Sequence, residues 1–166
     1  MKQLLAPAAF LLITLGSCAT HPAQDIGPKA YAAILNLEKA GKFTAAKKAA
    51  QSLVAARTQA LGPEHQETLR ARLELGKTLY FMGHHAEAEA ELKKLLPLMQ
   101  EAFGVEDRET LTCQSTLLDV LNAQDKYAET ISACRRLIPL QTRVLGPEDK
   151  ETLHSRGTLA LALGSQ

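Results

Sequence analysis

The side chains that could hold a metal ion in this 166-residue chain are gathered in one short run, His84, His85 and Glu87. Imidazole and carboxylate groups are common zinc ligands. The chain has no His-Glu-x-x-His pattern, however, which would place two imidazoles on one face of a helix beside a carboxylate base. The run falls at an expected turn between two helices, where polar side chains contact water. We therefore expect a solvated turn and no bound metal.

Other sequence patterns that carry chemistry are absent. There is no Gly-rich phosphate-binding loop, no Gly-x-Ser-x-Gly nucleophile motif and no Cys-x-x-Cys pair. Glu87 and Glu91 lie one helical turn apart, which is typical of surface charge and not of an acid and a base facing each other across a cleft. The sequence therefore predicts a protein that is not an enzyme and that needs no cofactor.

Two cysteines lie in the body of the chain, Cys113 early in an expected first helix and Cys134 late in its partner helix. In an antiparallel helix pair these positions fall roughly opposite one another, and an exported protein meets an oxidising compartment in which a disulfide can form. A disulfide requires the two Cα atoms to lie within about 7 Å. Free cysteines are also commonly buried as small apolar residues. We favour two buried free thiols and keep a Cys113–Cys134 disulfide as the alternative.

The N-terminus has the layout of an export signal. Lys2 precedes an apolar stretch from Leu4 to Leu15, which is shorter than the roughly 18 residues needed to span a bilayer. The stretch ends in Leu15-Gly16-Ser17-Cys18, which resembles the bacterial lipoprotein signal. This resemblance implies that residues 1–17 are a signal peptide, cleaved before Cys18, and that Cys18 carries the lipid. The alternative is an ordinary secretory signal with a chance cysteine.

A lipid on Cys18 would tether the exported protein to the bacterial cell envelope. One acyl chain holds a protein only marginally at a membrane, whereas two or more hold it stably. Ala19 follows the cysteine, and in the Gram-negative sorting pattern an Asp at that place favours retention at the inner membrane. The resemblance thus implies the outer membrane if the cell is Gram-negative. Residues 18–28 contain two prolines and one glycine and are expected to be the lipidated cysteine and a short tether.

Composition favours a helical protein that does not bind nucleic acid. Hydrophobic residues make up 46% of the chain, aromatic residues only 4%, and Trp is absent. A β-sandwich or barrel core would require more β-branched and aromatic residues. The chain has 19 Lys and Arg against 18 Asp and Glu, so it lacks the excess of basic residues that nucleic-acid binding requires.

Internal repetition dominates the rest of the sequence. The segment Leu61-Gly62-Pro63-Glu64-His65-Gln66-Glu67-Thr68-Leu69 reappears in similar form from Phe103 and from Leu145, so the three copies are evenly spaced and define a 42-residue period. A second pattern recurs with the same 42-residue spacing at Gly41-Lys42, Gly83-His84 and Asp125-Lys126. Two signals locked at one period predict an array of structural repeats.

Each repeat is expected to contain two helices. Gly62 and its two counterparts follow the second amphipathic run of each repeat, and a glycine at a helix end is typical of a left-handed backbone conformation. Asp107 and Asp149 precede the next helix as N-caps, and an acidic residue follows in its first turn.

One set of positions carries a specific resemblance. Apolar and small residues occur at Leu75-Gly76, Leu79, Gly83, Ala88 and Leu92, with Gly76 and Ala88 where two helices could approach closely. The pattern resembles the tetratricopeptide repeat, and the 42-residue period with its Leu-Gly-Pro-Glu-His linker looks like the kinesin-light-chain subtype. The resemblance covers residues 29–166. It implies an all-α fold, a right-handed superhelical solenoid of antiparallel helix pairs, with three pairs and a final single helix.

The resemblance also implies a protein or peptide partner, bound in a concave groove that the first helix of each pair lines. The corresponding positions are Tyr31, Glu38, Arg70, Lys77, Tyr80, Thr112, Ser115, Asp119 and Asn122. Asn122 is the only Asn among them, although the family often uses Asn to contact the ligand backbone. Each position could instead be a solvated wall of the groove.

The final helix is apolar on every side from Leu159 to Leu163. Because the end of a solenoid needs a polar outer face to stay soluble, we expect this helix to meet a partner or a second copy of the chain. The alternative is a hydrophobic tail that folds back on the last pair. The main functional prediction is a lipid-tethered interaction scaffold. A self-associating structural lipoprotein and a fragment of a longer repeat protein are the alternatives.

Overall fold

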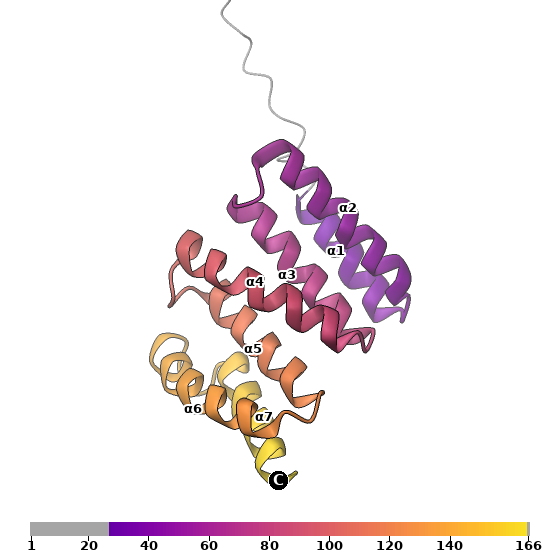
Figure 1. Cartoon of the computed structure of the whole chain (residues 1–166). Helices are drawn as coiled ribbons and strands as arrows, with labels where there is room; N and C mark the ends of the chain where they lie inside the picture. The colour runs from indigo at the N-terminus through magenta and orange to yellow at the C-terminus, as the bar shows by residue number, and fades with distance from the viewer. Residues whose placement is uncertain (1–26, 166) are drawn as a thin grey trace, which may run out of the picture.

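The computed structural model describes residues 27–165, which form seven α-helices and no strands. The helices are α1 (Gly27–Lys39), α2 (Phe43–Leu61), α3 (Gln66–Phe81), α4 (His85–Phe103), α5 (Arg108–Asn122), α6 (Tyr127–Val144) and α7 (Lys150–Gly164). Each helix packs against the next, and the pairs stack in chain order (Figure 1), so the expected all-α solenoid is confirmed. Helix α1 begins slightly before the expected boundary at 29. The predicted signal peptide and Cys18 lie outside the described residues.

The two helices of each pair are joined by a tight turn that repeats with the period of the sequence. The turn residues Gly41, Gly83 and Asp125 have φ angles of 69°, 75° and 59°. In the first pair the N–H of Gly41 and the N–H that follows it donate to the carbonyls of Glu38 and Leu37, at 2.9 and 2.8 Å. This pair of hydrogen bonds is the Schellman motif. Glycine adopts the positive φ without strain, whereas Asp125 carries a Cβ atom and adopts it at a cost.

The connection between successive pairs also depends on glycine. Gly62 has φ 95° and ψ 161°, and Gly104 has φ 97° and ψ 159°. The expected positive φ is confirmed, but a ψ near 160° belongs to an extended region that is essentially restricted to glycine, and not to the left-handed helical region. The reason is local: the N–H of Gly62 already donates to the carbonyl of Thr58 at 3.0 Å, and the chain then leaves the helix in an extended direction.

The first helix of each later pair is capped as the sequence predicts. The side chains of Asp107 and Asp149 each accept the N–H of the residue two positions later, at 2.8 and 3.0 Å. In α3 the cap is His65, whose Nδ1 accepts the corresponding N–H at 3.2 Å. A glutamate follows the cap in all three helices, where the helix dipole favours a negative charge.

The core is built from apolar clusters that join neighbouring pairs. The central cluster lies between α3, α4 and α5, and its fully buried members include Leu73, Leu92 and Met99. Gly76 lies at a close α3–α4 contact, as expected, because a Cβ atom there would lie 2.7 Å from Cδ2 of Leu92. Two further clusters contain residues of α1 to α3 and of α5 to α7. Each pair therefore buries its apolar face against its neighbours, which is how a solenoid is stabilised.

Candidate functional site

Helices α1, α3, α5 and α7 together form one face of the solenoid, called the inner face here, and this face carries two hollows. The first hollow has a volume of about 520 Å³, and the second about 330 Å³. The first hollow is lined by Tyr31, Ala32, Leu35, Glu38, Arg70, Glu74, Lys77, Phe81 and Glu109. The second hollow is lined by Lys77, Tyr80, Phe81, Thr112, Ser115, Thr116, Asp119, Glu151 and His154. Because Lys77 and Phe81 belong to both, the two hollows adjoin.

Most of the side chains that the sequence places in a groove line these hollows. Tyr31, Glu38, Arg70 and Lys77 line the first hollow, and Lys77, Tyr80, Thr112, Ser115 and Asp119 line the second. Asn122 lines neither. Its amide oxygen is buried and has no hydrogen-bond partner among the described residues.

The cations of the first hollow already contact carboxylates. The guanidinium of Arg70 donates to Glu67, lies 3.5 Å from a carboxylate oxygen of Glu109 and stacks 5.0 Å from the ring centre of Phe103. The ammonium of Lys77 lies 2.9 Å from a carboxylate oxygen of Glu74. Both cations are therefore held in place by the protein's own negative charges.

The other polar groups of the first hollow are partly removed from water. Glu38 accepts a hydrogen bond of 2.7 Å from the hydroxyl of Thr78, and burial raises the pKa of its carboxyl above the ordinary value. The hydroxyl of Tyr31 donates to the backbone carbonyl of Glu67 at 3.2 Å. Burial, together with the nearby charge of Glu67, raises the pKa of Tyr31 to about 12. Tyr31 is thus a neutral hydrogen-bond donor that also joins α1 to α3.

Two of the predicted groove residues in the second hollow hold helices together. Asp119 accepts hydrogen bonds from Nε2 of His154 at 2.8 Å and from the hydroxyl of Thr158 at 3.1 Å, which joins α5 to α7. Burial raises the pKa of Asp119, and the two hydrogen bonds oppose that rise. Ser115 is buried and accepts from Nε2 of Gln141 at 2.8 Å, which joins α5 to α6. Tyr80, Thr112 and Glu151 also line this hollow, and Tyr80 and Thr112 are among the residues that the sequence places in a groove.

Several residues of the inner face are absent from the set that the sequence predicts. These residues are Leu35, Glu74, Phe81, Glu109, Glu151 and His154. The repeat itself contains a signal for some of them, since Glu67, Glu109 and Glu151 occupy the same place in the repeated segment. Leu35 and Phe81 have exposed fractions of 48% and 53%, so they offer apolar surface beside these charges.

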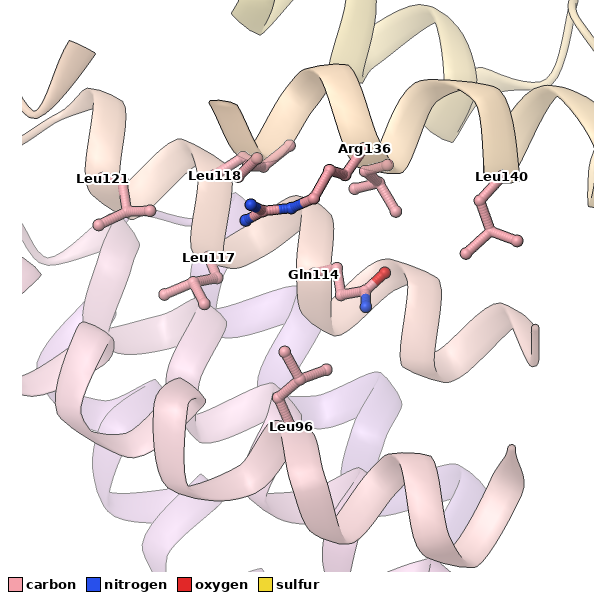
Figure 2. A pocket seen from close by; sticks show the side chains of 9 residues that line it. Leu96, Gln114, Leu117, Leu118, Leu121, Arg136 and Leu140 are labelled. Atoms are coloured by element: carbon pink, nitrogen blue, oxygen red, sulfur yellow. The ribbon is translucent and has the colours of Figure 1, made fainter. Parts of the chain in front are cut away.

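The opposite side of the solenoid carries an apolar slot of about 330 Å³, called the outer slot here (Figure 2). Its floor is α5, and its walls are α4 and α6, which do not contact one another. The slot is lined by Leu96, Gln114, Leu117, Leu118, Leu121, Ala133, Arg136, Leu137 and Leu140. Figure 2 shows the side chain of Arg136 extending from α6 toward Leu117 and Leu118.

Comparison with the preceding repeat explains why the outer slot is open. In that repeat Nε of Arg72 lies 2.7 Å from a carboxylate oxygen of Glu91, and this ion pair bridges α3 and α4. The equivalent positions of the next repeat hold Gln114 and Ala133. The short Ala133 side chain cannot reach Gln114, whose amide oxygen is buried without a partner in the described part of the chain. The ion pair of one repeat is thus replaced by a hollow in the next.

The histidine run lies at the α3–α4 turn, where Nδ1 of His84 is 3.1 Å from a carboxylate oxygen of Glu87. Residues 27–165 contain no group of three side chains suited to a metal ion. Cys113 and Cys134 are both buried and free, and they belong to separate apolar clusters. Burial raises their pKa values to about 12 and about 11.

Helix α7 presents its larger apolar side chains to solvent. Its buried face consists of Thr152, Ser155, Thr158 and Ala162. Leu153, Leu161 and Leu163 have exposed fractions of 46%, 65% and 49%.

Within residues 27–165, no helix has the length and apolar character needed to cross a bilayer.

Comparisons with known proteins agree with this architecture. The sequence model of the tetratricopeptide repeat family matches residues 30–101. Two crystal structures of kinesin light chain nearly identical TPR-like repeats from Podosopora anserina, one of them a single-substitution variant, resemble the chain with a TM-score of 0.77 each. The variant is 21% identical, with the match covering 87% of this chain and 68% of that chain. The other is 20% identical, covering 88% and 68%. No curated protein matches the chain.

At these identities the likeness to the solved structures establishes the fold. The chain folds as a tetratricopeptide-repeat solenoid. The predicted resemblance to kinesin-light-chain-type repeats is confirmed for the fold.

Proposed function

We propose that this chain is a non-catalytic scaffold that binds a peptide or protein partner along its inner face. The observation that supports the proposal most directly is the pair of adjoining hollows, which share Lys77 and Phe81 and extend across α1, α3, α5 and α7. Solenoids of stacked helix pairs use such an extended face to bind other proteins. Tyr31, Tyr80 and the exposed Phe81 offer aromatic surface there, and aromatic residues are enriched where proteins bind one another.

Site-specific photocrosslinking in the native cell tests this proposal. A photoreactive amino acid is placed at Leu35 or Phe81, which line the first hollow, and at Arg135 of α6 as a matched exposed position that lines none of these hollows. We expect both inner-face positions to capture the same partner protein and Arg135 not to capture it. Capture from Arg135 alone, or different proteins from Leu35 and Phe81, would contradict the proposal.

We also propose that the scaffold is exported and anchored in the bacterial envelope through a lipid on Cys18, at the outer membrane if the cell is Gram-negative. The Leu15-Gly16-Ser17-Cys18 sequence and the Ala19 that follows support this proposal. Metabolic labelling with an alkyne fatty acid tests it. The unsubstituted protein and a Cys113→Ala control should both be labelled, whereas Cys18→Ala should not be labelled. Labelling of the Cys18→Ala form would contradict the proposal.

The exposed leucines of α7 favour a second candidate, a structural lipoprotein that associates with copies of itself. Leu161, which is 65% exposed, would be the centre of such a contact. Sedimentation of the non-acylated Cys18→Ala chain decides between the two candidates. A dimer or larger assembly that is lost on Leu161→Glu supports self-association, and a monomer at high micromolar concentration contradicts it.

A further inference from the structure

We propose that the inner face selects an extended partner segment that carries Lys or Arg side chains next to aliphatic ones. The proposal rests on the proposed function, since it names the chemistry of the partner that the inner face binds. Two properties of the adjoining hollows support it, their charge and their exposed apolar side chains.

The inner face is acidic although the chain as a whole is not. Five carboxylates line the hollows, against the two permanent cations Arg70 and Lys77. The carboxylates are Glu38, Glu74, Glu109, Asp119 and Glu151. The whole chain, in contrast, has 19 basic and 18 acidic side chains. The two hollows therefore have an excess of carboxylates over permanent cations that the chain as a whole lacks.

The excess charge is also periodic along the solenoid. Glu67, Glu109 and Glu151 occupy equivalent positions in the first turns of α3, α5 and α7. Glu109 lines the first hollow and Glu151 the second, so a segment that crosses α5 and α7 would meet a carboxylate at the same place on each helix. An extended chain suits this arrangement because its successive side chains can point to evenly spaced places.

The two cations do not balance this charge. Arg70 lies between Glu67 and Glu109, and Lys77 lies against Glu74. Among the described residues no Lys, Arg or His side chain lies within ion-pair distance of Glu38 or Glu151. Burial and the nearby Glu74 raise the pKa of Glu38, with the Thr78 hydrogen bond and Lys77 acting against them. A bound ammonium or guanidinium would therefore gain attraction that the protein's own cations leave unused.

The apolar part of the partner follows from Leu35 and Phe81. Both side chains are about half exposed and lie in the first hollow beside Glu38. Aliphatic side chains of a partner would cover them, while the neighbouring Lys or Arg reaches the carboxylates. An acidic segment would meet like charges instead, because Arg70 and Lys77 already contact carboxylates.

Fluorescence anisotropy with three synthetic peptides tests the proposal on the full chain carrying Cys18→Ala. The peptides are short, extended sequences of Ser, Gly and Leu that differ only at fixed positions, which hold Lys in one, Gln in the second and Glu in the third. We expect the Lys peptide to bind about tenfold or more tightly than the Glu peptide, with the Gln peptide between them, and the difference to shrink at high salt. Equal binding of the Lys and Gln peptides, or no binding of the Lys peptide, overturns the proposal.

Isosteric variants place the interaction on the inner face. Glu38→Gln, Glu109→Gln and Glu151→Gln should each weaken binding of the Lys peptide by about two- to fivefold, as removal of one exposed charge pair does. Glu148→Gln, an exposed carboxylate outside both hollows, is the matched control and should change nothing. Lys77→Gln should tighten binding, a gain that misfolding cannot imitate. Unchanged affinity in all four inner-face variants overturns the proposal.

Failure of this inference and failure of the proposed function look different. If the crosslinked partner is captured from Leu35 and Phe81 while the peptides show no preference for Lys, the inner face binds proteins but charge does not select them. If neither the partner nor any peptide contacts the inner face, the proposed function itself is wrong.

Discussion

Gly76 of α3 and Leu92 of α4 lie so close that a Cβ atom on Gly76 would stand 2.7 Å from Cδ2 and 3.1 Å from Cγ of the leucine. Leu92 is fully buried in the central cluster, so its side chain has little room to move away. The separation of the two helices in this pair therefore depends on the absence of a side chain at position 76.

We predict that Gly76→Ala lowers the free energy of unfolding by about 1 kcal/mol, since overpacking of a core by one methyl group costs about 1–3 kcal/mol and outweighs a gain of about 1 kcal/mol in helix propensity. The matched control is Gly157→Ala in α7, where a Cβ atom would meet nothing within 4 Å. That variant should be more stable than the unsubstituted protein. Urea denaturation followed by circular dichroism measures both. Equal stabilisation by the two substitutions would show that the α3–α4 contact can relax.

A second prediction concerns the outer slot, which α4, α5 and α6 form. Ala133→Leu would fill part of the slot and should raise the free energy of unfolding by about 1 kcal/mol, the usual gain from filling a cavity. Ala90→Leu on the exposed face of α4 is the control, and it should have little effect. Thermal denaturation compares the two variants. A loss of stability in Ala133→Leu would mean that the slot is narrower in solution or already holds an occupant.

The elements of this fold could be predicted because their signals are local. The constant period, the glycine at 62 and the caps at Asp107 and Asp149 depend on residues within a few positions of one another, and each is found where expected. The exception is the ψ angle of Gly62, which depends on the direction of the next helix and not on the helix that ends there.

The roles of the groove residues were harder to predict because they depend on contacts with the next repeat. Asp119 accepts a hydrogen bond from Thr158, and the hydroxyl of Ser115 lies 3.4 Å from that of Ser155. Two side chains that the sequence pattern places in a ligand-binding groove therefore contact α7 instead. For Ser115 the sequence contains a signal in the repeat register. Ser115 occupies the same place in its repeat as Leu73, which is fully buried, and a residue in that register is expected to face the core.

A third prediction concerns Glu89 of α4, which joins two successive repeats. Its carboxylate accepts hydrogen bonds from Lys126 at 2.7 Å, from Lys93 at 2.6 Å and from Gln124 at 2.8 Å. The bonds from Lys126 and Lys93 lower the pKa of Glu89 from 4.5 to about 2. The stabilisation by the ionised carboxylate is therefore complete above about pH 4.5 and is lost as the pH falls toward 2.

Glu89→Gln should accordingly lower the free energy of unfolding by about 1 kcal/mol at neutral pH, the upper end for an accessible ion pair. The difference between the variant and the unsubstituted protein should shrink as the pH falls from 4.5 toward 2. The control is Glu101→Gln, an exposed carboxylate of the same helix that makes no ion pair with a described residue. Urea denaturation across this pH range measures the effect. A difference that stays constant with pH would assign it to packing and not to charge.

A final prediction concerns the two buried thiols. Burial raises the pKa of Cys113 to about 12 and that of Cys134 to about 11, and only the thiolate form reacts readily as a nucleophile with thiol reagents. In the Cys18→Ala chain at pH 8, no more than about one in a thousand of either thiol is ionised, and the apolar clusters block access as well. Iodoacetamide should therefore modify neither cysteine in the folded protein and both in guanidinium chloride, as mass spectrometry would show. Rapid modification of the folded protein would contradict this structure. Resistance in guanidinium that disappears on reduction would instead reveal a Cys113–Cys134 disulfide.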